Sequence, residues 1–239
     1  MLVAGLLALK ISFDVLLRYP DYFPPDFRSQ YLAGREDYFW GWYRWAFWTH
    51  IVSGPAALVL GVVLLNEWFR LSFTKWHRWL GRVQVVNQLV LMVPSGFAIA
   101  FYAVAGTQAV VSFLVLSVLT GGTIAMGWRS AVRRRYAEHR RWMLRNMALL
   151  FSAVMLRVSI GAASVLRFDP DWLDPVLTWG SWLLPLVLVE LSFYAKRLKV
   201  FHDLAAVDRQ QSLTSHCGKV FRKRLNSSVT KAGHDNPSM

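Results

Sequence analysis

Cysteine and charge are both scarce in this chain. A single cysteine, Cys217, excludes an internal disulfide and a metal cage made of thiolates. Charged residues make up 17% of the chain, against about 25% in an average soluble domain. A phosphate-binding glycine loop, a metalloprotease helix motif and a nucleophile elbow are all missing. These absences count against a disulfide-stapled domain and against the common soluble enzymes, but they leave open whether any reaction is catalysed.

Apolar and aromatic residues are abundant instead. Hydrophobic residues reach 55% and aromatic residues 15%, with 12 tryptophans. The 27 lysines and arginines outnumber the 14 acidic residues, which raises the question of nucleic-acid binding. The basic residues, however, cluster in short stretches between apolar runs and do not form one basic face. The composition therefore predicts an integral membrane protein that does not bind nucleic acid.

Long apolar runs divide the chain into membrane spans. About 20 apolar residues are needed to cross the hydrocarbon core of a bilayer. Five runs meet this requirement, at 46–65, 83–104, 109–128, 143–166 and 175–195, and a weaker run at 1–18 carries Lys10 and Asp14. The predicted fold is therefore all-α, a polytopic membrane helix bundle (residues 1–195) of about six transmembrane helices. The tail at 196–239 is basic and polar, a composition typical of partial disorder.

The distribution of basic residues predicts the orientation of the bundle. Lysine and arginine gather in the loops at 66–82 and 129–145, whereas the loop at 168–174 is acidic. The positive-inside rule then places both basic loops and both termini on the cytoplasmic side of a bacterial inner membrane. Anionic lipid is the partner expected at that face, and no protein partner is indicated. The aromatic segment at 19–44 falls on the outer side, where it suits the headgroup zone or a lid over an outward-facing site.

Two similar stretches open two of the spans. "WHRWLGRV" at 76–83 and "EHRRWMLRN" at 138–146 each contain a His-Arg pair. Both precede helices of the same predicted direction, as in a parallel two-helix repeat. Arginine at such a position anchors a helix by binding lipid phosphate. That role explains the arginines of this inner-rim motif better than its histidines; the motif comprises His77, Arg78, Arg82, His139, Arg140 and Arg145.

The order of these motifs resembles a known family. A helix that opens with "HIVSG" is followed by "HRWLGRV", by a helix with "VPSG", and by "HRRWMLRNMAL" with a further arginine on the same helix. This pattern is similar to bacterial predicted membrane proteins that share domain of unknown function 2306, over residues 45–195. The resemblance implies a multi-helix inner-membrane protein and brings no known activity. It draws attention to His50, His77, His139, Arg145 and Arg157.

Four ionisable side chains fall within the predicted spans. They are His50, Arg157, Asp14 and Lys10, all placed in the outer half of the bilayer. Such residues are costly in lipid and are candidates for function. His50 and Arg157 each belong to a stripe of small residues, so both are expected to face other helices. A polar lock between helices, a pocket for an anionic or polar small molecule, and a proton or redox relay are the three interpretations.

Three functions follow from these alternatives. The first is a transporter or sensor with an outward-facing pocket built from His50, Arg157 and Asp14, in which Pro94, Gly96 and "TGGT" at 120–123 break helices to line a cavity. The second is a non-catalytic assembly or lipid-interacting protein. The third is a b-type haem protein that uses His77 and His139, which are also the residues expected to bind a metal if any is bound. No cofactor is predicted, and haem b is the alternative.

Overall fold

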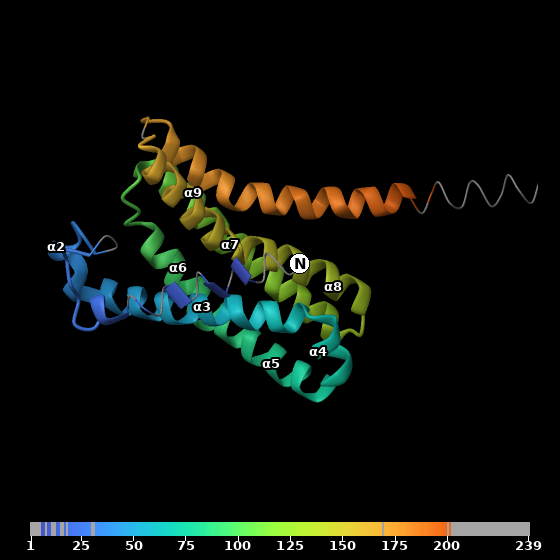
Figure 1. Cartoon of the computed structure of the whole chain (residues 1–239). Coiled ribbons are helices and arrows are strands. Elements are labelled where there is room, and N and C mark those ends of the chain that lie inside the picture. Colours follow the sequence, from blue (N-terminus) through green and yellow to red (C-terminus); the bar gives the residue numbers. More distant parts are fainter. Residues whose placement is uncertain are drawn as a thin grey trace, which may run out of the picture. The chain divides into compact units, whose positions relative to one another are not determined.

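The described part of the chain is helical. The computed structural model of the protein describes residues 6, 7, 9, 10, 13, 14, 17, 19–29, 32–168, 170–199 and 201. Two compact units are distinguished, Met1–Val189 and Glu190–Met239, and the fold below is that of the first (Figure 1). Its helices are η1 (Tyr19–Asp21), α2 (Glu36–Tyr38), η2 (Phe39–Tyr43), α3 (Arg44–Leu65), α4 (Glu67–Ser72), α5 (Thr74–Val86), η3 (Asn87–Met92), α6 (Val93–Ala100), α7 (Gly106–Val132), α8 (Tyr136–Leu150) and α9 (Ser152–Leu166). A last helix, Leu173–Lys199, follows α9 in the chain.

Five helices are long and apolar enough to cross a membrane. Within the described residues these are Glu36–Leu65, Thr74–Ala100, Gly106–Val132, Tyr136–Leu166 and Leu173–Lys199. They correspond to the five strong runs of the sequence, and the only β pairing in the described residues is an isolated bridge between Tyr22 and Pro25. The all-α bundle is therefore confirmed. Whether residues 1–18 span a membrane stays a prediction, and so does the partial disorder of the tail at 196–239. Most of both segments lies outside the described residues.

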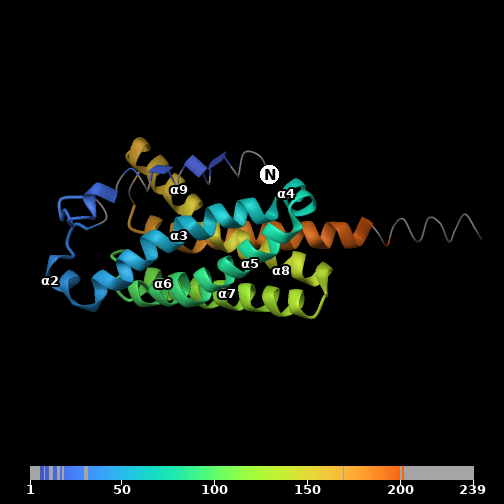
Figure 2. The same cartoon turned by 90° about the horizontal axis from the view of Figure 1, so that it is seen from below.

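The helices of the first unit define two ends of the bundle. The α2 end holds α2 and the start of α3, and the α4 end holds α4 and the turn between α7 and α8 (Figure 2). Asn66 separates α3 from α4, since its side chain caps α4 by accepting a hydrogen bond from the Phe69 amide at 3.2 Å. At the opposite end, Arg167 stops α9 in a left-handed conformation (φ 51°).

Small residues let the helices of the first unit approach closely. α7 packs against both α6 and α8, and α3 packs against α5, α6 and α8. A Cβ atom built on Gly127 of α7 would collide with the terminal methyl group of Met143 on α8. A Cβ on Gly121 would lie 3.3 Å from Val93 of α6. Glycine therefore supports close helix contact at these points, as is common in membrane bundles.

The prediction that "TGGT" breaks its helix is wrong. α7 continues without interruption from Gly106 to Val132, because an interrupted backbone within a membrane would leave polar groups unsatisfied. Gly121 of this motif serves contact with Val93. The second span does change its winding. Residues Asn87–Met92 form a π-helical turn directly before Pro94, and such turns often occur at functional sites.

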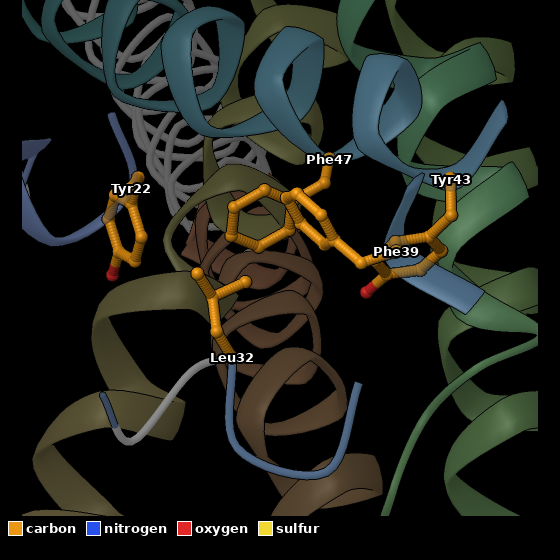
Figure 3. Close-up of a cluster of buried hydrophobic side chains, with 5 residues drawn as sticks. All are labelled: Tyr22, Leu32, Phe39, Tyr43 and Phe47. Atoms are coloured by element: carbon orange, nitrogen blue, oxygen red, sulfur yellow. The ribbon is translucent and has the colours of Figure 1, made fainter. Parts of the chain in front are cut away.

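The aromatic segment at 19–44 packs on itself and on the start of α3. Figure 3 shows five side chains of this cluster gathered together, namely Tyr22, Leu32, Phe39, Tyr43 and Phe47. All five are buried, and Phe39 contacts Phe47 with ring centroids 5.9 Å apart. The segment therefore forms a small core of its own at the α2 end.

Candidate functional site

An elongated cavity lies within the first unit. It has a volume of about 680 Å³ and is enclosed by α3, α6, α7, the end of α8 and α9, a size within the range of small-molecule sites. On the side of α3 its lining runs from Tyr43 to Leu58. At a rise of 1.5 Å per residue, this stretch corresponds to about 22 Å. The cavity therefore extends from the α2 end to the middle of the bundle.

His50 lies near the middle of the α3 wall. Its Nδ1 is 3.3 Å from the Met92 carbonyl oxygen and 3.4 Å from the Ser95 hydroxyl. Gly96 leaves room for the ring, since a Cβ atom there would lie 2.9 Å from His50 Cε1. The π-helical turn and Gly96 together seat the imidazole against the second span. Gly96 also lines the cavity, whereas Pro94 is not among the described lining residues.

Arg157 lines the same cavity from α9. The structure thus brings together the two residues that carry the sequence-based site, His50 and Arg157. Lys10 and Asp14 pair with each other at 4.0 Å, but their side chains are 73% and 52% exposed. Neither is among the described residues that line the cavity. The candidate site therefore consists of His50 and Arg157 without the Lys10–Asp14 pair.

A second guanidinium group lines the cavity at the α2 end. Arg35 donates hydrogen bonds from Nη1 to the Tyr43 hydroxyl and, at 3.3 Å, to the Tyr102 carbonyl oxygen. It ties the aromatic segment to the end of α6. Neither aspartate nor glutamate occurs among the described residues that line the cavity. Sequence reasoning missed Arg35, although its position among the tyrosines and tryptophans of the aromatic segment was a signal.

Both inner-rim histidines lie at the α4 end, His77 in the first turn of α5 and His139 in the first turn of α8. His139 Nδ1 is 2.9 Å from the Gly127 carbonyl oxygen. His77 Nδ1 is buried and has no hydrogen-bond partner in the described part of the chain. In that same part, no three His, Cys, Asp or Glu side chains gather as a metal site. The two His-Arg copies therefore lie at one end of the bundle, as the repeat predicts.

The rim arginines lie beside exposed tryptophans. Arg78, Arg82 and Arg140 are exposed, and Arg145 stacks on the Trp142 ring at 4.8 Å. Trp76 and Trp79 are exposed as well. Exposed tryptophan next to arginine is typical of the headgroup level of a bilayer.

A buried amide network joins the middle helices and was missed from the sequence. Gln88 and Asn146 exchange two hydrogen bonds of 3.0 Å, and Asn146 also donates to Thr123 Oγ1 at 3.1 Å. Gln84 donates to the Ala57 carbonyl at 2.7 Å and Asn87 to the Ser53 carbonyl at 3.0 Å. The signal was the spacing of Gln84, Asn87 and Gln88 at i, i+3 and i+4, which puts three amides on neighbouring helix positions.

We expect Asn146→Leu to destabilise the folded protein by about 1–2 kcal/mol. Interhelical hydrogen bonds in membrane bundles contribute about 0.6–1.7 kcal/mol each, and the Gln88 amide would be left buried without its partner. Adding Gln88→Leu should cost less than the sum of the two single changes. Unfolding of the three variants in detergent with a chemical denaturant measures this. Strict additivity would show that the two amides do not interact.

The fold defines a class, a polytopic α-helical membrane protein, here with an internal cavity whose lining includes Arg35, His50 and Arg157. The chain belongs to the family described as predicted membrane protein (DUF2306), whose model matches residues 47–193, more than half of the chain. This confirms the resemblance seen in the sequence. The matched region contains His50, His77, His139 and Arg157, whereas Arg35 lies before it. No curated protein and no solved structure matches the chain.

Proposed function

We propose that this membrane protein binds a small anion in the cavity between α3, α6, α7 and α9, as the substrate of a transporter or the ligand of a sensor. One observation carries the proposal: His50 and Arg157 line a single cavity whose described lining includes a second arginine and no acidic residue. A planar guanidinium group binds carboxylate or phosphate through two parallel hydrogen bonds. In a medium of low dielectric such contacts are stronger than in water.

Ligand-induced stabilisation tests this proposal. The full chain, purified in a neutral detergent, would be heated with a panel of carboxylates and phosphates and with uncharged molecules of matched shape. A ligand at 100 times its Kd stabilises the folded state by about 2.7 kcal/mol, so bound anions should raise the unfolding temperature measurably. We expect stabilisation by members of the anionic set alone. Stabilisation by uncharged molecules only would contradict the proposal.

The proposed orientation places the α4 end in the cytoplasm of a bacterium, with anionic lipid around its rim arginines, and opens the cavity outward. Its basis is the positive-inside rule. Cys217, the chain's single cysteine, lies outside the described residues. Its labelling shows on which side of the membrane the tail lies. We expect a membrane-impermeant thiol reagent to label it only after spheroplasts are opened. Labelling of Cys217 in intact spheroplasts would reverse the orientation.

The position of His77 and His139 at the same end of the bundle keeps a haem function as the second candidate. A hydrogen bond from His139 Nδ1 to the Gly127 carbonyl leaves Nε2 with the lone pair that ligation needs. We nevertheless expect these histidines to lock neighbouring helices, and we expect the purified protein to show neither a Soret band nor stoichiometric metal. His77→Gln with His139→Gln should then change neither property. A Soret band that the double variant loses would make haem binding the function.

A further inference from the structure

We infer that the ligand is an anion with a single apolar tail, its charged head between His50 and Arg157 and its tail directed toward Leu58 and Leu150. This inference rests on the proposed function and names the ligand class. It follows from how polarity changes along the cavity. The charged side chains of the described lining, Arg35, His50 and Arg157, lie toward the α2 end or level with His50. The part beyond His50 includes Leu58, Leu149 and Leu150 and no charged side chain among the described residues.

The deep part of the cavity is suited to a hydrocarbon chain. Leu58 lies eight residues beyond His50 on α3, which corresponds to about 12 Å along the helix. Leu149 and Leu150 line this part from the end of α8, and Met92 lines it from the second span. Two hydroxyl residues, Thr120 and Ser152, also line this part, and the Thr120 hydroxyl already donates to the Leu116 carbonyl at 2.7 Å. A chain of methylene groups would therefore meet mainly apolar surface, and each buried CH₂ adds to the binding free energy.

The part near the α2 end is suited to a charged group. Arg35 donates hydrogen bonds to the Tyr43 hydroxyl and to the Tyr102 carbonyl oxygen at this end. His50 and Arg157 line the cavity further from the α2 end. A tail-first entry would leave the anionic head beside Arg157 while the tail reaches the leucines. The opposite arrangement would set the tail against guanidinium and tyrosine hydroxyl groups.

The volume limits the ligand to one chain. A cavity of about 680 Å³ is of the size that holds one drug-sized molecule. A bilayer phospholipid has two acyl chains and a larger headgroup, so we expect a free single-chain amphiphile and not a membrane lipid. Carboxylate and phosphate heads share the geometry that a guanidinium group recognises.

Binding of radiolabelled decanoate tests the inference. The full chain would be placed in nanodiscs of neutral phosphatidylcholine, with empty nanodiscs as background. We expect saturable binding that decyl phosphate displaces, whereas decanol, acetate and anionic phosphatidylglycerol do not. Arg157→Gln should lower the affinity at least about tenfold. Arg78→Gln removes the same charge from an exposed position at the α4 end and should leave binding unchanged.

The alternative outcomes separate the inference from the proposed function. If acetate competes as well as decyl phosphate, the tail is not recognised; the inference fails and the anion site stands. Displacement by phosphatidylglycerol would make the ligand a bilayer lipid and would also overturn the inference. If decanol displaces decanoate, or if no anion binds to the folded protein, both the inference and the proposed function fail. If Arg157→Gln does not fold, Arg157→Lys is tested in its place. Lysine keeps the charge but cannot form the two parallel hydrogen bonds of a guanidinium group, so we expect weaker binding of the anion.

Discussion

Gly96→Val is expected to destabilise the protein by about 1–3 kcal/mol, the usual cost of overpacking a well-filled interior. A Cβ atom at position 96 would lie 2.9 Å from His50 Cε1 and 3.2 Å from Nδ1. Two further methyl carbons would force the ring from its place beside the Met92 carbonyl. Denaturant unfolding of the purified protein in detergent measures the effect.

Two comparison variants test whether the destabilisation by Gly96→Val comes from displacement of the His50 ring. In a His50→Ala background the same Gly96→Val change should be much less harmful, because the ring that it displaces is gone. Gly122→Val on α7 is the matched control, since a Cβ there meets nothing within 4 Å. Equal destabilisation with and without the His50 ring would mean that Gly96 is needed for the helix and not for the seat of the imidazole.

Arg157→Met is expected to lower anion affinity about tenfold to a hundredfold while the folded protein persists in the membrane. A hydrogen bond to a charged group contributes about 1.5–3 kcal/mol, and methionine fills a similar volume without the charge. Binding measured on the detergent-purified variant, beside its unfolding temperature, separates the loss of a site from the loss of the fold. If helix locking were the role of Arg157, the variant would bind normally and would be about as stable as the parent.

The helices could be predicted from the sequence because a bilayer imposes a simple rule on composition. A span needs about 20 apolar residues and a satisfied backbone, and the run at 109–128 alone places most of α7. The same rule explains why the predicted break of α7 at "TGGT" is wrong. Glycines within "TGGT" suggest interruptions from the sequence alone, but in a membrane helix a glycine can serve contact with a neighbour, here between Gly121 and Val93.

The candidate site was only partly predictable. His50 and Arg157 could be found because each lies on a stripe of small residues that must face other helices. For Arg35 the one signal was its position among tyrosines and tryptophans, and its place in the cavity depends on how the aromatic segment folds back onto Tyr102. The pairing of Gln88 with Asn146 joins residues 58 positions apart, and spacing within one helix does not reveal a partner on another.

The charge preference of the cavity tests the central claim most directly. Ser117 lines the cavity and is nearly buried, so a Ser117→Cys change in a Cys217→Ser chain places a single thiol inside it. The reaction rates of this thiol with a sulfonate and with a trimethylammonium thiosulfonate reagent would be compared, each divided by its rate with a free thiol. A cavity lined by Arg35 and Arg157 should favour the anionic reagent at least about tenfold, and Arg157→Met should reduce that preference. Equal rates, or a faster reaction with the cationic reagent, would contradict an anion-binding cavity.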